Sequence, residues 1–156
     1  MIEHIKKILP ITKKYKVKLI INDDIQLAYK FKIVGFHLGQ NDLKKNKKKM
    51  CLDKKIVFGI TCHNSLSLAK KAMLLGPTYV AFGAFFPTKT KKVKYVANKY
   101  ILKKAKKLNT KIVAIGGITN KNYMDLLKFG ADFIAISSFV WKNKELTPLE
   151  AIKLFK

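Results

Sequence analysis

Six continuous apolar runs recur along this chain of 156 residues, and polar sequence separates each run from the next. The runs occupy residues 17–22, 33–39, 55–61, 78–86, 110–118 and 131–138. Apolar and polar residues do not alternate within them, which is typical of strands covered on both faces of a parallel sheet. Most of the intervening segments have helical patterns. A chain that alternates strands with helices predicts a parallel α/β fold built from βα units.

The expected helices differ in how clearly the sequence marks their ends. They cover about residues 24–32, 64–75, 95–108, 120–130 and 148–155, and mixed helical sequence also follows Met1. Asn64 and Asn120 are placed to cap two of them, and Gly130 and Pro148 mark one end and one beginning. The second apolar run leads instead into a lysine run at residues 44–49, for which no helix is expected.

Length and composition predict a single domain over residues 1–156, because 49% hydrophobic content is enough for a sizeable core. No apolar run approaches the ~20 residues of a membrane span, and no signal-like segment follows Met1. The two cysteines, Cys51 and Cys62, form no CxxC pair, which suits a reducing compartment. The expected location is therefore the cytoplasm.

The formal net charge of +24 raises the question of a nucleic-acid partner. All 33 basic residues are lysine, and arginine, the preferred reader of base edges, is absent. The lysines are spread along the chain rather than gathered in a recognition motif. We interpret the charge as solvated surface, with no specific nucleic-acid partner and with nonspecific attraction to polyanions at low salt.

Polar residues gather at the carboxyl ends of the six runs. They are Asn22, Asp23, Gln40, Asp42, Thr61, His63, Thr88, Thr90, Lys91, Gly116, Gly117, Ser137 and Ser138. The carboxyl ends of the strands form the active face of a (β/α)8 barrel, where phosphate groups bind near the last two strands. One stretch, FGAFFPTKTK at residues 82–91, combines hydroxyls and a cation directly after an apolar run, which favours a phosphate-bearing ligand over a plain solvated loop.

Five motifs together resemble a known family. IINDD, GFHLGQND, FGAFFPTKTK, VAIGGIT and GADFIAISS occur in this order. The chain resembles the thiamine phosphate synthase family over nearly its whole length. The resemblance implies a (β/α)8 TIM-barrel-type fold and an enzyme that joins hydroxymethylpyrimidine diphosphate to thiazole phosphate, forming thiamine phosphate and pyrophosphate. It also implies a requirement for Mg²⁺.

The resemblance assigns roles to the strand-end residues. Asp23 and Asp42 match the magnesium ligands, although Asp23 could instead cap the following helix. Asn22 and Lys91 match contacts to the diphosphate and are the expected catalytic residues. Thr61 stands where the family usually has serine, and Gln40 is either a ligand or structural. The expected thiazole phosphate contacts are Thr88, Thr90, Gly117, Ser137 and Ser138.

The motifs leave the roles of two histidines open. His63 is more readily interpreted as a structural or orienting residue than as a general base, because the family chemistry requires no base at this position. His37, inside GFHLG, is expected to be a packed strand histidine. Gly116 and Gly117 also suit a tight turn between strand and helix, and that interpretation is compatible with a phosphate site.

The chain departs from the family at its beginning, since the first two βα units have no counterpart here. About six parallel βα units are therefore expected, with open edges that favour self-association and with little synthase activity for this chain alone. Two alternatives remain: a non-catalytic remnant that binds phosphate ligands or polyanions, and a relative of the thiazole tautomerase, which relies on a histidine near the position of His63. Intact Asp23, Asp42 and 88–91 favour the synthase.

Overall fold

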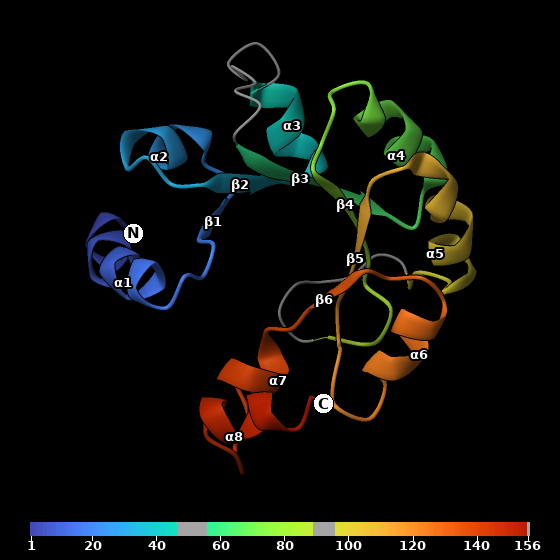
Figure 1. Cartoon of the computed structure of the whole chain (residues 1–156). Helices are drawn as coiled ribbons and strands as arrows, with labels where there is room; N and C mark the ends of the chain where they lie inside the picture. The colour runs from blue at the N-terminus through green and yellow to red at the C-terminus, as the bar shows by residue number, and fades with distance from the viewer. Residues whose placement is uncertain (47–55, 89–95, 156) are drawn as a thin grey trace. The chain divides into compact units, whose positions relative to one another are not determined.

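A computed structural model describes residues 1–46, 56–88 and 96–155 of the chain (Figure 1). The chain forms two compact units, Met1–Thr61 and Cys62–Lys156, and each is considered by itself. Within the described residues, no helix is both long enough and apolar enough to cross a membrane.

The first unit consists of three parallel strands with helices before and between them. Its elements are α1 (Ile2–Lys14), β1 (Ile20–Asn22), α2 (Ile25–Lys30), β2 (Gly35–Leu38), α3 (Gln40–Asn46) and β3 (Val57–His63), the last of which ends just beyond the unit. Asn22 pairs with His37, and His37 pairs with Gly59. This register brings the carboxyl ends of the three strands to the same edge of the sheet.

One face of the β2–β3 pair forms the core of the first unit. Phe36, Leu38 and Ile60 are completely buried, and Phe58 is nearly so. The rings of Phe36 and Phe58 stack with their centroids 5.6 Å apart. Burial of each such side chain stabilises the fold by about 1.5–3 kcal/mol, so this layer fixes the register of the two strands.

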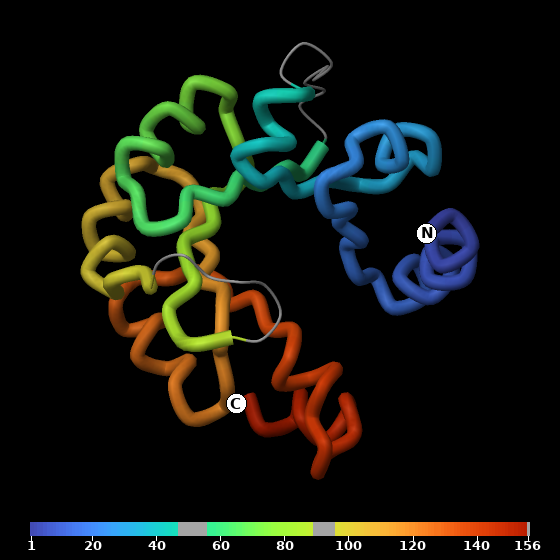
Figure 2. The backbone as a smooth tube through the Cα atoms, turned by 180° about the vertical axis from the view of Figure 1, so that it is seen from behind, coloured from blue at the N-terminus to red at the C-terminus, as the bar shows by residue number. Residues whose placement is uncertain are grey.

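The second unit continues the same pattern of strand and helix. Its elements are α4 (Leu66–Met73), β4 (Tyr79–Gly83), α5 (Tyr100–Ala105), the 3-10 turn η1 (Lys106–Leu108), β5 (Lys111–Ile115), α6 (Tyr123–Lys128), β6 (Phe133–Ala135), α7 (Ser138–Trp141) and α8 (Pro148–Lys153). β5 pairs in parallel with both β4 and β6. Helices α4, α5 and α6 lie along one side of these strands (Figures 1 and 2).

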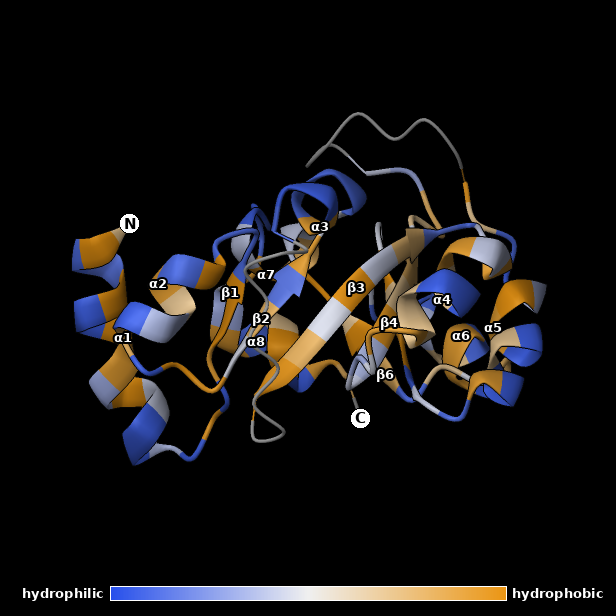
Figure 3. Ribbon diagram, turned by 90° about the horizontal axis from the view of Figure 1, so that it is seen from above, coloured by the Kyte–Doolittle hydropathy of each residue, from blue (hydrophilic) through white to orange (hydrophobic). Residues whose placement is uncertain are grey.

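The two faces of the β4–β6 sheet differ in burial. Val80, Phe82, Ile112 and Ala114 are all at 2% exposure or less. On the other face, Ile115 of β5 and Phe133 of β6 are 41% and 57% exposed although both are apolar, whereas Ala81 of β4 is 2% exposed. Figure 3 colours the chain by hydropathy. The expectation that both faces would be covered is therefore wrong for β5 and β6, whereas β4 has buried residues on both faces.

The predicted helix ends need correction at two caps. Ser65, not Asn64, caps α4 by accepting a hydrogen bond from the Leu68 amide at 3.2 Å, because β3 extends to His63 and delays the helix. Asn122, not Asn120, is the N-cap residue of α6.

Two helices were not predicted, and several are shorter than expected. The unpredicted helices are α3, whose sequence QNDLKKN carries a single apolar residue, and the four-residue α7. The helix expected at 95–108 begins only at Tyr100 and ends as the 3-10 turn η1. The helices expected over 24–32, 120–130 and 148–155 correspond to the shorter α2, α6 and α8.

Candidate functional site

The ends of β1 and β2 place two acidic residues at one edge of the first unit. Asp24 caps α2 by accepting a hydrogen bond from the Leu27 amide at 3.0 Å. Asp23 therefore does not perform the capping role that the sequence left open for it. Its backbone is left-handed, with φ at 65°, a conformation that Asp and Asn adopt more readily than most residues. The Asp23 amide donates to the His37 carbonyl at 2.8 Å, which fixes this turn against β2.

Gly39 brings the Asp23 and Asp42 carboxylates to a common point. The Gly39 amide donates to Asp23 Oδ1 at 3.3 Å. A Cβ added at Gly39 would lie 3.2 Å from Asp42 Oδ2 and 3.9 Å from Asp23 Oδ1. One oxygen of each carboxylate thus lies near Gly39, and the glycine has no side chain to separate the two.

This pair of carboxylates has the chemistry of a magnesium site. Mg²⁺ prefers oxygen ligands and is commonly held by one or two carboxylates together with substrate phosphates. Asp23 is exposed and Asp42 half-buried, so both could be reached by a charged ligand. Across the described ranges, no cluster of three or more His, Cys, Asp or Glu residues could hold a metal ion by itself. A site made by this pair would need further ligands from a substrate.

Thr61 is held by two side chains from the neighbouring strand and helix. His37 Nε2 lies 2.8 Å from Thr61 Oγ1. The Gln40 side-chain amide donates to the Thr61 carbonyl oxygen. Gln40 therefore has a structural partner, which favours the structural interpretation of that residue. Asn22, the last residue of β1, is exposed beside the same edge, and its carbonyl accepts from the Asp24 amide at 2.9 Å.

At the carboxyl edge of the second unit, two glycines allow close backbone approach. Gly116 and Gly117 both have positive φ, at 101° and 64°. A Cβ on Gly117 would lie 2.5 Å from the Pro87 carbonyl oxygen and 2.7 Å from that of Phe86. The segment that leads into Thr88 therefore packs directly on Gly117. The tight-turn interpretation of this glycine pair holds, and it places Thr88 close to the end of β5.

The loop after Gly117 is held by Asn122. The Asn122 side chain donates to the Gly117 carbonyl at 3.1 Å and accepts from the Thr119 amide at 2.9 Å. The amides of Lys121 and Tyr123 donate to Thr119 oxygens as well. These amides at the start of α6 are therefore already hydrogen-bonded within the loop. Sequence reasoning missed Asn122; its position three residues after a strand-end threonine was the available signal.

The remaining predicted site residues are placed as follows. Ser137 and Ser138 follow β6, Ser137 exposed and Ser138 half-buried, and Ser138 begins α7. Ile115 of β5 pairs with Ala135 of β6. Gly117 follows Ile115, and Ser137 follows Ala135, by the same number of residues, so both come just after the carboxyl ends of these strands. Thr90 and Lys91 lie outside the described residues.

The last two residues of β3, Cys62 and His63, differ in chemistry. Burial raises the pKa of the Cys62 thiol to about 12, so this cysteine is inert at neutral pH. His63 is exposed at the end of β3 with φ at 50°. Its interpretation as a structural or orienting residue stays a prediction.

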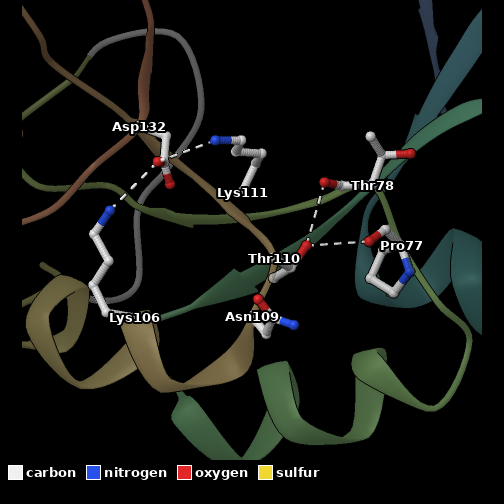
Figure 4. Close-up of a pocket in the computed structure, with 7 residues that line it drawn as sticks. All are labelled: Pro77, Thr78, Lys106, Asn109, Thr110, Lys111 and Asp132. Atoms are coloured by element: carbon white, nitrogen blue, oxygen red, sulfur yellow. Dashed lines mark hydrogen bonds and ion pairs between the residues drawn. The ribbon is translucent and has the colours of Figure 1, made fainter.

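The opposite edge of the second unit carries an ion-pair cluster instead of a strand-end site. An open depression of about 390 Å³ lies at this edge. Within it, Asp132 lies between Lys106 and Lys111 (Figure 4). Asp132 pairs with them at 3.4 and 3.7 Å and accepts from the Ile112 amide at 2.9 Å. Burial raises the pKa of Asp132, but the Ile112 hydrogen bond and the two lysines outweigh it and lower that pKa below its usual value. Its carboxylate is thus committed to joining β5 and β6.

A family comparison agrees with the motifs. The sequence model described as "Thiamine monophosphate synthase" matches residues 1–140. A protein of Pelagibacter ubique named "Thiamine-phosphate synthase" is 53% identical over 152 residues, which cover 97% of this chain and 73% of that protein. A Xylella fastidiosa protein of the same name is 33% identical over 99% of this chain and 65% of its own length. The chain thus spans roughly two thirds to three quarters of these relatives.

A solved structure agrees with the fold. The thiamine phosphate pyrophosphorylase of Pyrococcus furiosus superposes with a TM-score of 0.76 at 26% sequence identity. The match covers 92% of this chain and 68% of that one. The α/β fold of parallel βα units expected from the sequence is therefore confirmed as that of a TIM-barrel-type relative.

Proposed function

Because the chain belongs to the thiamine phosphate synthase family, we propose that it joins hydroxymethylpyrimidine diphosphate to thiazole phosphate, releasing pyrophosphate and forming thiamine phosphate. This makes it a transferase of thiamine biosynthesis. The observation that carries the proposal is the carboxylate pair of Asp23 and Asp42, which each place one oxygen beside Gly39 at the carboxyl edge of the first unit. A substrate diphosphate supplies the further oxygen ligands that such a pair needs.

Asp23 and Asp42 would hold a magnesium ion at the edge of the first unit. When bound, the ion supplies positive charge that neutralises the diphosphate. Asp24, already engaged as a helix cap, is left out of the ligand set.

The reaction breaks the bond between the pyrimidine methylene carbon and the diphosphate oxygen. The electron pair of that bond leaves with pyrophosphate, and the aminopyrimidine ring stabilises the cation left behind. The thiazole nitrogen then forms the new carbon–nitrogen bond. Asn22 and Lys91 would donate hydrogen bonds to the departing oxygens, and Thr61 would contribute its hydroxyl. Lys91 enters the proposal through the sequence motif alone. Catalysis then rests on positioning and electrostatics, without a general base.

The edge of the second unit would bind thiazole phosphate. Thr88 follows the Phe86–Pro87 segment that packs on Gly117, and Ser137 and Ser138 follow the adjacent β6. Thr90 joins this group through the sequence motif. Hydroxyls and backbone amides at strand ends are suitable donors to a phosphate.

We propose that the enzyme lies in the cytoplasm and forms a single barrel-type domain over residues 1–156. Its open sheet edges would allow it to self-associate. Its partners would be the two small-molecule substrates, with no specific nucleic acid and no membrane.

A turnover assay tests the function. Thiamine phosphate formation would be measured for the purified chain and for the chain fused to the part of the Pelagibacter relative that it does not match. We expect magnesium-dependent turnover in the fusion and much less in the chain alone. Absence of turnover in both, with phosphate ligands still bound, would contradict the proposal and support the non-catalytic alternative.

A further inference from the structure

His37 lies on the face of β2 that does not form the hydrophobic core. Its neighbours Phe36 and Leu38 are completely buried, and side chains alternate between the two faces of a strand. On β3, Ile60 and Cys62 are completely buried in the same way. Thr61 between them therefore shares the other face with His37.

The register explains how the two side chains meet. His37 pairs directly with Gly59, and Thr61 is two residues further along β3. Because Gly59 has no side chain, the imidazole can extend along β3 toward Thr61. The resulting contact joins His37 Nε2 and Thr61 Oγ1 at 2.8 Å, a good hydrogen-bond length.

Thr61 is also held through its backbone. The Gln40 amide donates to the Thr61 carbonyl oxygen, so two side chains, one from β2 and one from α3, bind one residue of β3. A threonine hydroxyl has one donor and two acceptor sites, and its χ1 is restricted by β-branching. The bond to His37 occupies one of these sites and thereby fixes where the others point.

We propose that His37 is a positioning residue of the diphosphate site, acting through Thr61. The inference rests on the proposed function, because it takes Thr61 as a contact to the pyrimidine diphosphate. His37 Nε2 holds the Thr61 hydroxyl so that its remaining hydrogen-bonding capacity faces the same strand edge as Asp23 and Asp42. His37 itself transfers no proton and does not touch the substrate.

A double-mutant cycle tests this role. Binding of magnesium pyrophosphate would be measured by calorimetry for the wild-type chain, His37→Leu, Thr61→Val and the double variant. His37→Gln can place an amide near the position of Nε2, and His4→Leu removes an exposed histidine of α1 as the matched control. Thermal unfolding of each variant checks that it folds.

We expect His37→Leu to weaken binding by about 5-fold, as for loss of one hydrogen bond. Thr61→Val should weaken it at least as much, and the double variant should match Thr61→Val within about 2-fold because the two act as one unit. His37→Gln and His4→Leu should stay close to wild type.

Three results would overturn the inference. The first is that His37→Leu binds magnesium pyrophosphate as tightly as the wild type, and the second is that adding His37→Leu to Thr61→Val weakens binding by the same factor as it does in the wild type. The third is that the wild-type chain does not bind magnesium pyrophosphate. Thiamine phosphate formation by the fusion is a separate readout. Its failure would contradict the proposed reaction, while the binding cycle would still decide whether His37 acts through Thr61.

Discussion

The two strand-end regions are built in different ways. In the first unit, side chains form the candidate site: Asp23 and Asp42 flank Gly39, while His37 and Gln40 hold Thr61. In the second unit, the backbone forms it, since Gly116 and Gly117 have positive φ and the Phe86–Pro87 segment packs against Gly117. Removal of a functional group should therefore impair the first region with little loss of stability. A change of backbone shape should damage the second through folding.

Gly117→Ala should have the largest effect on stability. The new Cβ would lie 2.5 and 2.7 Å from two carbonyl oxygens, in a left-handed backbone. We therefore expect the free energy of unfolding to fall by about 3 kcal/mol or more. Urea unfolding measures it. Gly76→Ala is the matched control, because its φ is also 64° but no atom lies within 4 Å of the added Cβ. That control should lose only about 1 kcal/mol. Equal losses would mean that the close contact does not matter.

Thr88→Ala combined with Ser138→Ala should weaken binding of thiazole phosphate by at least about 10²-fold, because hydrogen bonds to charged groups contribute about 1.5–3 kcal/mol each. Titration calorimetry with thiazole phosphate is the measurement. The free energy of unfolding of this double variant should change little by comparison with that of Gly117→Ala. An affinity that does not respond to the double substitution would separate these hydroxyls from the phosphate site.

Asp132→Asn should lower the free energy of unfolding by about 1–2 kcal/mol, since it weakens a hydrogen bond to Ile112 and two lysine pairs. The folded-state pKa of Asp132 is lowered, so its stabilisation is complete above the usual Asp pKa of about 3.9 and disappears as pH falls through the folded value.

The control is Asp125→Asn, whose half-exposed pair with Lys99 should contribute below about 1 kcal/mol. Urea unfolding at pH 7 and at pH 3 should show a gap between wild type and Asp132→Asn that shrinks at the lower pH. A gap of unchanged size would contradict the assignment.

Gly39→Ala should have the smallest effect. Its Cβ would lie 3.2 Å from Asp42 Oδ2, so the carboxylate must shift by a few tenths of an ångström. We expect magnesium-dependent pyrophosphate binding to weaken by about 3- to 5-fold. The free energy of unfolding should change by about 1 kcal/mol at most. A loss of stability as large as that of Gly117→Ala would end the contrast between the two regions.

The sequence predicted the strands well because each is a continuous apolar run whose polar end residues share a register. Asp23 and Asp42 reached one edge for that reason. The sequence could not show that Asp24, one residue further, takes the capping role, because the choice depends on the left-handed turn at Asp23. It could not place α3, which has no apolar periodicity. Nor could it show the exposure of Ile115 and Phe133, which depends on what covers that face of the sheet.

The contact between His37 and Thr61 could be predicted only in part. Strand alternation places both residues on one face, but the register that sets Gly59 opposite His37 comes from the three-dimensional pairing of β2 and β3. Likewise, Ser65 replaced Asn64 as a cap because β3 extends further than its apolar run. Caps and register depend on contacts between segments, and one run of sequence does not contain them.

Titration of pyrophosphate into the chain, with and without magnesium, tests the central claim most directly when Asp42→Asn is compared with Asp24→Asn. Both variants lose one carboxylate charge, but asparagine caps a helix about as well as aspartate. We expect Asp42→Asn to remove most of the magnesium-dependent affinity, by at least about 10-fold, and Asp24→Asn to keep it within about 2-fold. Equal magnesium dependence in Asp42→Asn and wild type would contradict a metal and diphosphate site at this edge.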